Sequence, residues 1–434
     1  MTASVAYVLM GYPRVSETFI ASEIHRVEQA GVPLRLYVIK PVEEREQGHR
    51  HPVQDAIRAQ PEYLPDPSLM TQQLHQWRLR HVRAFLPSVR RCLRERRKGS
   101  LRAIRTIGGQ LARDRRGLFG LPRKHYIKEL LQAFALADRL LDAPDVRHLH
   151  AHFAHGTTTV TWLAACITGL PFSFTGHARD IYSYKLNRKG WLRRKLLAAA
   201  FVVTCTEANV RHLKAIAPEA TVHLVYHGLS ADFTDLLRTN GAAPQRNGRL
   251  RILGVGRLVA KKGFDTLVDA CAALQDRGVP FEALIVGQDD KDGEALRRRI
   301  AERGVPVALP GPVGPETLLE EYRRAGALCM PCRLLPTDRD GIPNVLVEAM
   351  AAGAPVVATA VSGIPELVEH EVNGLLVPPD DPEALADALL RLHNDPELTA
   401  QLIRHGRVTV RERFDGERLA RELAALFTEA VQGC

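Results

Sequence analysis

Two carboxylates, Asp340 and Glu348, stand eight positions apart around the segment Asp-Gly-Ile-Pro-Asn-Val-Leu-Val-Glu. Pro343 is suited to open a helix, because its missing N–H is one that a first helical turn leaves unpaired. Asp340 should then precede the helix and Glu348 lie within it. The main-chain N–H groups of residues 341–345 would point outward at the helix N-terminus, where partial positive charge favours an anion such as phosphate. Because carboxylates accept hydrogen bonds from hydroxyls, the segment predicts a ligand with both phosphate and sugar hydroxyl groups.

A second set of candidate residues comes earlier, in Gly254-Val-Gly-Arg-Leu-Val-Ala-Lys-Lys-Gly263. Arg257 can bind a phosphate through two parallel hydrogen bonds, and Lys262 adds a point charge. Glycines allow the backbone to approach a ligand closely. The alternative is a glycine turn with solvated basic residues, and the carboxylates at 340 and 348 favour the phosphate interpretation.

The elements around these residues alternate between apolar runs and amphipathic segments. We expect strands at 251–255, 281–286, 305–309 and 327–331, and helices at 264–274, 294–303 and 315–325. This alternation predicts a parallel, doubly wound sheet with helices on both faces.

The first half of the chain shows a similar pattern. We expect strands at 4–10, 34–39, 148–152, 172–176, 201–205 and 222–226, helices at 18–30 and 128–141, and a surface loop at 43–67. The loop at 11–18 leaves the carboxyl end of the first strand, where open α/β sheets bind ligands. A proline and glycine turn with a Ser or Thr helix cap is the alternative for this loop.

Histidines alternate at positions 148, 150 and 152, with a further one at 155. Alternating residues share one face of a strand, so a metal site is one interpretation. Packing or hydrogen bonding is the other, and it is favoured because the pattern contains no carboxylate or cysteine. His177 follows a strand end and is better placed for site chemistry, with a structural hydrogen-bonding role as its alternative.

Composition limits the class of protein. The chain has 434 residues and 45% hydrophobic content, which suits two globular domains, and no apolar run reaches the length of a membrane span. The N-terminus enters a strand pattern without a basic leader, so we expect a cytoplasmic protein. Seven cysteines suit a reducing compartment. A redox or metal pair at Cys329 and Cys332 is an alternative without a second such pair to support it.

Positive charge is concentrated between Arg78 and Lys128, where seventeen Lys or Arg residues face two acidic ones. Apolar residues interleave with the basic ones, so this segment predicts amphipathic helix, kinked or interrupted at Pro87. The cationic face could be solvated, or it could bind an anionic membrane surface. Nucleic acid is not an expected partner, because no zinc-finger spacing or RNA-binding aromatic motif is present.

These motifs together resemble a known family. Gly256-Arg257, Lys262-Gly263, Asp340, Glu348-Ala-Met and Gly353-x-Pro355 resemble the retaining, nucleotide-sugar-dependent glycosyltransferases of family 4, which have the GT-B fold. Tyr12-Pro-Arg-Val-Ser-Glu-Thr-Phe19, His150-Ala-His-Phe-Ala154 and Phe174-Thr-Gly-His-Ala-Arg-Asp180 look like the branch that builds bacterial exopolysaccharides such as colanic acid or amylovoran. The usual family pattern has Glu where this chain has Asp340.

The resemblance implies an α/β architecture of two Rossmann-like, doubly wound domains that face a cleft. The implied bounds are an N-terminal acceptor-side domain at 1–235, a linker at 236–249 and a nucleotide-sugar-binding domain at 250–414. A final helix within 415–434 would pack back on the N-terminal domain.

The resemblance also implies residue roles. Arg257 and Lys262 would neutralise the donor diphosphate, Glu348 would hold the ribose, and Asp340 and His177 would contact the transferred sugar; these five are the implied catalytic residues. The implied donor-binding residues are Gly256, Arg257, Lys262, Val313, Gly341, Ile342, Pro343, Asn344, Val345 and Glu348. The implied acceptor-side residues are Arg14, Ser16, Glu17, Thr18, His152, Arg179 and Asp180. No metal ion and no cofactor are expected.

The expected function is transfer of a hexose from a nucleotide diphosphate sugar to a lipid-linked oligosaccharide, in bacterial exopolysaccharide, capsule or lipopolysaccharide synthesis. The protein would act at the inner face of the cytoplasmic membrane, to which segment 78–128 would bind. Alternatives are a nucleotide-sugar epimerase or a phosphorylase on the same fold, or a non-catalytic protein that binds a partner through the basic segment.

Overall fold

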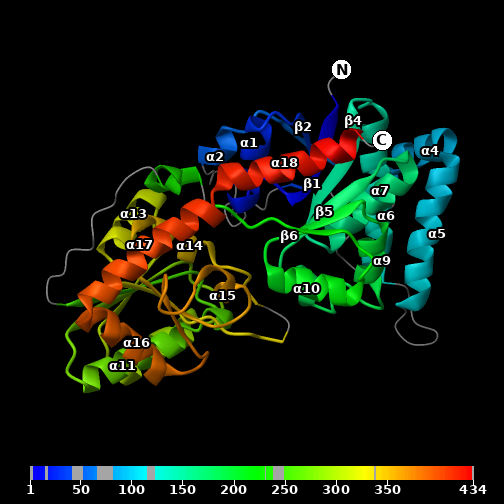
Figure 1. The fold of residues 1–434 in the computed structure, drawn as a ribbon. Coiled ribbons are helices and arrows are strands. Elements are labelled where there is room, and N and C mark those ends of the chain that lie inside the picture. The colour runs from blue at the N-terminus through cyan, green and yellow to red at the C-terminus, as the bar shows by residue number, and fades with distance from the viewer. Residues whose placement is uncertain are drawn as a thin grey trace. The chain divides into compact units, whose positions relative to one another are not determined.

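The computed structural model describes residues 3–14, 18–41, 52–65, 82–114, 123–229, 231–237, 249–336 and 339–432. They form two compact units, drawn in Figure 1. The first comprises Met1–Cys205, Asn209–Val225 and Ala420–Cys434, and the second comprises Thr206–Ala208 and Tyr226–Leu419. The second unit begins before the predicted linker because Leu229, Phe233 and Leu236 are buried in its core. Residues 238–248 of that linker lie outside the described residues.

The first unit contains a sheet of seven parallel strands in the order β3-β2-β1-β4-β5-β6-β7. The strands are β1 (Ser4–Gly11), β2 (Leu34–Lys40), β3 (Pro61–Tyr63), β4 (Val146–His152), β5 (Phe172–Gly176), β6 (Phe201–Thr204) and β7 (Val222–Leu224). The strand order reverses between β1 and β4. In open α/β sheets, ligands bind beyond the carboxyl ends of the strands at such a reversal.

Helices cover both faces of this sheet. They are α1 (Thr18–Gln29), α2 (Pro52–Asp55), α4 (Leu86–Glu95), α5 (Arg97–Arg113), α6 (Lys124–Leu141), α7 (Gly156–Thr168), α8 (Arg179–Tyr182), α9 (Trp191–Ala198), α10 (Glu207–Ile216) and the later part of α18 (Gly416–Gln432). Figure 1 shows α4 and α5 on the outside of α6 and α7. Gly99 in α5 allows close packing there, since a Cβ atom at this position would lie 2.3 Å from the main-chain oxygen of Ile167 in α7.

Strand β4 separates an apolar face from a histidine face, because successive side chains of a strand point to opposite sides. Leu149 and Ala151 belong to the apolar core that α7 also lines. His148 and His150 lie on the other face, where their rings contact the ring of Phe427 in α18.

The second unit contains six parallel strands in the order β10-β9-β8-β11-β12-β13, with the reversal between β8 and β11. The strands are β8 (Leu250–Val255), β9 (Phe281–Val286), β10 (Val307–Gly311), β11 (Ala327–Met330), β12 (Val356–Thr359) and β13 (Leu375–Val377). Its helices are η5 (Ala231–Leu237), η6 (Ala260–Lys262), α11 (Phe264–Asp276), α12 (Gly293–Arg303), α13 (Pro315–Arg324), α14 (Asn344–Ala352), α15 (Ile364–Leu367), α16 (Pro382–Asn394) and α17 (Pro396–Arg413). The predicted pair of doubly wound parallel sheets is therefore confirmed.

One sequence-based prediction about local structure is wrong. Residues 43–67 do not form only a surface loop, because α2 and β3 lie within this range. Within the part of the chain that the structure describes, strand β3 pairs with β2 alone and lies at the edge of the sheet. Pro61 is tolerated as its first residue because an edge strand need not donate a hydrogen bond outward.

The described part of the basic segment contains α4, α5 and the first residues of α6. Pro87 stands in the first turn of α4, where its missing N–H is not needed, and a second break separates α4 from α5 at Arg96. Among the described residues, no helix is both long enough and apolar enough to cross a bilayer.

Of the cysteine pair, Cys329 lies in strand β11 and Cys332 follows the end of this strand, and both are in the core. Both Cys329 and Cys332 are free thiols and buried. Burial raises the pKa of Cys332 to about 12, so this side chain stays a protonated thiol at neutral pH.

Candidate active site

The loops after β8 and β11 meet at the strand-order reversal of the second unit. Gly256 has φ +154°, and a Cβ atom there would lie 3.0 Å from Cε of Lys262, so the lysine chain crosses the loop where no side chain interferes. Gly263 has φ +68°, and a Cβ atom there would lie 1.9 Å from the main-chain oxygen of Pro331. Glycine is required at 263 for both reasons, and the two loops are in direct contact.

Two lysines and one carboxylate lie together between these loops. Nζ of Lys261 lies 2.9 Å from Oδ1 of Asp340, and Nζ of Lys262 lies 2.8 Å from Oδ2. Burial alone would raise the pKa of Asp340, but the charges of Lys262 and Lys261 outweigh it and lower the pKa to about 2. The Asp340 carboxylate also raises the pKa of Lys262 against the opposing effect of burial. The group therefore carries two cations and one anion, a net positive charge.

Helix α14 begins beside this group. Pro343 takes the N-cap position with extended backbone, and no side chain caps the first turn. Ile342 and Val345 pack against the core of the unit, which fixes the direction of the helix axis. An N-terminus with no side-chain cap presents main-chain N–H groups and a partial positive charge, the two features that bind phosphate.

Glu348 lies in α14, one turn or more from its start, and is half-buried. The hydroxyl group of Tyr322 in α13 donates a hydrogen bond of 2.9 Å to its Oε2. Tyr322 is completely buried, and this burial together with the Glu348 charge raises the pKa of the phenol well above its usual value. The phenol therefore remains a donor and holds one oxygen of the Glu348 carboxylate in place.

Arg257 and Val313 lie at other points of the same sheet edge. The Arg257 side chain is 54% exposed, and its Nη1 lies 3.3 Å from a carboxylate oxygen of Asp290. Val313 follows the edge strand β10 and packs partly against the core. The structure thus brings Lys262 and Asp340 into contact, whereas Arg257 pairs with a different carboxylate.

In the first unit, Asp180 fixes the two loops that leave β4 and β5. Its carboxylate accepts hydrogen bonds from the main-chain N–H groups of Ala154 (2.7 Å), His177 (3.1 Å) and Ala178 (3.0 Å). Burial raises the pKa of Asp180 against the effect of these hydrogen bonds. A buried carboxylate with three main-chain donors positions the loops. For Asp180, which was predicted on the acceptor side, the structure thus shows contacts with the main chain of these loops.

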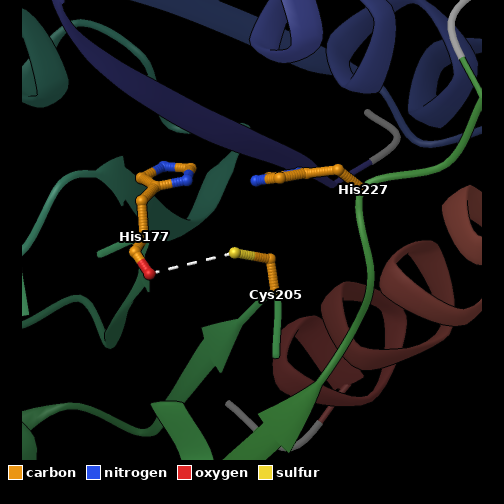
Figure 2. Close-up of side chains that lie close together, drawn as sticks. All are labelled: His177, Cys205 and His227. Atoms are coloured by element: carbon orange, nitrogen blue, oxygen red, sulfur yellow. Dashed lines mark hydrogen bonds between the residues drawn. The ribbon is translucent and has the colours of Figure 1, made fainter. Parts of the chain in front are cut away.

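The main chain of His177 is held from several directions. Its carbonyl oxygen accepts hydrogen bonds from the side-chain amide of Asn209 and from the Cys205 thiol, whose Sγ lies 3.8 Å away. Figure 2 shows the Cys205 side chain pointing at this carbonyl; His227, also drawn there, belongs to the second unit. The imidazole ring lies among the rings of Phe19, Phe153 and His152. Both the loop and the ring of His177 are therefore fixed.

The alternating histidines of β4 are hydrogen-bonded to their neighbours. The Ser173 hydroxyl lies 2.7 Å from Nε2 of His148 and 2.8 Å from Nδ1 of His150, and the Thr175 hydroxyl lies 3.0 Å from Nε2 of His150. Burial lowers the pKa of His148 to about 4 and the pKa of His150 well below its usual value. Both rings are therefore neutral at physiological pH.

A possible metal-binding group exists on this face. Glu23, His150 and His152 bring three potential ligand atoms within 4.8 Å of one another. Both ring nitrogens of His150 contact hydroxyl groups, and both ring nitrogens of His152 contact other side chains. A metal ion would have to break these contacts, so the group fits a hydrogen-bonding role better.

The remaining predicted acceptor-side residues lie around the same sheet edge. Arg14 and Thr18 are half-buried, His152 is buried and Arg179 is exposed. Gln54 of α2 donates a hydrogen bond to the main-chain oxygen of Arg14. Ser16 and Glu17 lie outside the described residues.

Three contributors were not found from the sequence. Lys261 adjoins Lys262, and only the short turn η6 places both ammonium groups on one carboxylate. Tyr322 lies in an amphipathic helix with no motif to mark it. Glu23 contacts His152 across 129 positions of sequence, which no local pattern can show.

Two doubly wound parallel units, with lysines, carboxylates and an uncapped helix at the reversal of the second, define the GT-B class of fold. Solved structures share it. The chain superposes on sucrose-phosphate synthase from Thermosynechococcus elongatus with a TM-score of 0.67, at 20% identity, over 99% of this chain and 100% of that one. It superposes on Anabaena HepE in complex with UDP and glucose with a TM-score of 0.64, at 17% identity, over 98% and 100%.

Sequence comparison identifies the family. The model of a protein family described as "Glycosyl transferases group 1" matches residues 249–395. The chain is 32% identical over 304 residues to the GDP-mannose-dependent alpha-(1-6)-phosphatidylinositol monomannoside mannosyltransferase of Mycobacterium tuberculosis, covering 64% of this chain and 78% of that protein. The chain belongs to the group 1 glycosyltransferases.

Exopolysaccharide proteins are also similar to it. The amylovoran biosynthesis glycosyltransferase AmsK of Erwinia amylovora is 38% identical over 41% of this chain and 44% of that protein. The putative colanic acid biosynthesis glycosyltransferase WcaL of Escherichia coli K12 is 36% identical over 57% of this chain and 54% of that protein. The chain thus spans about half the length of these two curated relatives.

Proposed function

We propose that this protein transfers a hexose from a nucleotide diphosphate sugar to a lipid-linked saccharide, with retention of configuration, in bacterial exopolysaccharide, capsule or lipopolysaccharide synthesis. The observation that carries the proposal is the net positive group of Lys261, Lys262 and Asp340 beside the uncapped N-terminus of α14. A diphosphate joined to a sugar needs both cations and hydroxyl acceptors at one place. The amylovoran and colanic acid biosynthesis proteins among its relatives support a role in polysaccharide synthesis.

In this proposal the residues act on the donor as follows. Lys262, with Arg257 as a second cation, stabilises the charge that grows on the diphosphate as the bond from the anomeric carbon to the phosphate oxygen breaks. The acceptor oxygen bonds to the same face of that carbon, and its proton passes to the departing phosphate. Glu348 accepts hydrogen bonds from the ribose hydroxyls, and Asp340 accepts them from the sugar.

His177 is the contribution that we propose for the first unit. Its loop is fixed by Asp180, Asn209 and Cys205, which is the rigidity that a group acting on a substrate needs. We assign to its imidazole a contact with the transferred sugar near the reacting carbon.

We also propose that α5 attaches the protein to an anionic membrane surface. Leu101 and Ile104, one turn apart, are 39% and 38% exposed on the solvent side of this helix. Four exposed cations flank them: Arg97, Lys98, Arg102 and Arg105. Apolar side chains bordered by cations suit the boundary between lipid headgroups and acyl chains. Arg91 of α4 is not part of this face, since it pairs with Asp138 and Asp142 of α6.

A transfer assay tests the function. Purified protein is incubated with UDP-, GDP- and ADP-sugars and with lipid-linked saccharides extracted from a polysaccharide-producing bacterium, and sugar incorporation into lipid is measured. An epimerase would change the donor without acceptor, and a phosphorylase would require inorganic phosphate. Incorporation that is lost in Lys262→Ala and kept in Lys291→Ala, an exposed lysine of the same unit, supports the proposal. Absence of incorporation with every donor contradicts it.

A further inference from the structure

A chain of hydrogen-bonding groups runs from helix α1 to His177 inside the first unit. The Glu23 carboxylate oxygen Oε1 lies 3.1 Å from Nε2 of His152, and Nδ1 of His152 lies 3.3 Å from Nε2 of His177. The His152 side chain is 1% exposed and that of Glu23 is 15% exposed. Carboxylate, imidazole and imidazole therefore follow one another largely out of contact with water.

The phenol of Tyr7 completes the first link. Its hydroxyl donates a hydrogen bond of 3.0 Å to the same oxygen of Glu23. Burial, followed by the Glu23 charge, raises the pKa of Tyr7 well above its usual value, so it stays a donor. The oxygen Oε1 consequently accepts from both sides, and His152 must present a hydrogen to it.

The direction of each hydrogen bond follows from this acceptor. An ionised carboxylate can only accept, so Nε2 of His152 carries the hydrogen. In a neutral His152 ring the other nitrogen, Nδ1, is then an acceptor, and Nε2 of His177 must donate to it. A neutral His177 ring with its hydrogen on Nε2 has an acceptor nitrogen at Nδ1.

We propose that Glu23 and His152 are positioning residues that fix His177 in the tautomer with hydrogen on Nε2 and an acceptor at Nδ1. This inference rests on the proposed function for its consequence, because His177 acts on the sugar only in that proposal. There, an acceptor nitrogen suits a hydrogen bond from a hydroxyl group of the substrate. A proton that reaches His177 would be stabilised through the same chain by the Glu23 charge.

The His150 ring does not belong to this chain although it adjoins it. Its nitrogens contact Ser173 and Thr175, and it meets the His152 ring edge-on at 5.3 Å between centroids. The proposal therefore predicts that His150 can exchange tautomers independently of His177.

The test is nitrogen-15 NMR of the full chain with labelled histidine, which separates protonated ring nitrogens from bare ones. Spectra of His177→Gln and His152→Gln assign the two rings by the signals that disappear. We expect a single tautomer of His177 with hydrogen on Nε2 and none on Nδ1. A wild-type spectrum with the hydrogen on Nδ1, or with equal populations, overturns the proposal whatever the variants do.

Glu23→Gln tests the cause. The neutral amide can offer either oxygen or hydrogen to His152, so we expect the His177 signals to become those of a mixture. The matched control is Glu28→Gln in the same helix, whose carboxylate instead accepts from the main-chain N–H groups of Arg58 and Ala59. Unchanged His177 signals in Glu23→Gln, or an equal change in Glu28→Gln, overturn the proposal.

Activity distinguishes this inference from the proposed function. If both hold, kcat of Glu23→Gln falls about tenfold or more, with the KM for the donor unchanged, which is the effect of losing a hydrogen bond to a charged group. A tautomer that shifts with no loss of kcat supports the hydrogen-bond chain and counts against the sugar contact of His177. A tautomer that does not shift counts against the chain alone.

Discussion

Nζ of Lys262 lies 2.8 Å from the carboxylate of Asp340, and Lys261 contacts the other oxygen of the same group. One anion thus holds two cations at the start of α14. A donor phosphate that binds Lys262 must share the ammonium group with Asp340 or replace it. Under the proposed function, a stronger ion-pair group would lower donor affinity, and the first two predictions concern this group.

Replacing Asp340 by Asn removes the anion that competes for the two lysines. We expect a free nucleoside diphosphate to bind about tenfold more tightly, the size of one hydrogen bond to a charged group. The gain for the complete nucleotide sugar should be smaller, because the sugar loses its carboxylate acceptor. Calorimetric titration of both ligands measures the difference. Asp292→Asn is the control, since its carboxylate accepts from the Ala260 N–H in the same loop. Weaker diphosphate binding in Asp340→Asn would contradict the competition.

The same carboxylate gives a dependence of stability on acid pH. The pKa of Asp340 is about 2 in the folded protein and about 3.9 when the chain is unfolded. Because the folded value is the lower one, the ion pair stabilises the protein above pH 4, by about 2 kcal/mol, and this contribution is lost as pH falls toward 2. Calorimetric unfolding should show Asp340→Asn less stable than the wild type at pH 5, with the gap closing by pH 2. A gap independent of pH would show that the charge is not the cause.

Tyr322→Phe removes the hydroxyl group that holds Glu348 and keeps the buried ring. We expect the nucleotide to bind about tenfold more weakly, because a hydrogen bond to a charged group contributes about 1.5 kcal/mol. Tyr226→Phe is the matched control, since it removes a hydroxyl bonded to Glu366, another carboxylate of this unit. Titration with UDP, GDP and ADP compares the two variants. Equal losses in both, or no loss in Tyr322→Phe, would remove Tyr322 from the site.

The exposed face of α5 is tested by its apolar residues. Leu101→Ser combined with Ile104→Ser should lower binding to phosphatidylglycerol vesicles about tenfold or more, since burial of one such side chain contributes about 1.5 to 3 kcal/mol. Vesicle flotation at low and high salt measures it. Val408→Ser, which removes an exposed apolar side chain of α17, should leave binding unchanged. If the wild-type protein does not bind anionic vesicles at low salt, membrane attachment is contradicted.

Sequence patterns predicted the fold well because the signals for it are local. The alternation of apolar and amphipathic segments gave both sheets, and Pro343 located the start of α14 within one residue. Strand β3 was missed because it has only three residues and begins with proline, which leaves no strand pattern in the sequence. It is recognised as a strand by its pairing with β2.

The sequence marks only some residues of the candidate site, for a physical reason. Lys262, Asp340 and Glu348 stand in motifs along the chain, whereas Tyr322 and Glu23 reach their partners only through the fold. The ion pair of Lys262 and Asp340 could not be predicted from the sequence either, because it depends on the close approach of Gly263 to Pro331. Residues that position others leave no local signal, because their spacing is set by the packing of helices on a sheet.

The most direct test of the proposed donor site is binding of nucleotide sugars to the intact protein, measured as a change in its unfolding temperature. A ligand at one hundred times its dissociation constant stabilises the folded state by about 2.7 kcal/mol. We predict that at least one of the UDP-, GDP- and ADP-sugars raises the unfolding temperature. Lys262→Ala and Glu348→Gln should abolish the shift, whereas Glu321→Gln, which only weakens an ion pair with Arg251, should keep it. No shift with any nucleotide sugar, or an undiminished shift in Lys262→Ala, would contradict a donor site at Lys262, Asp340 and Glu348.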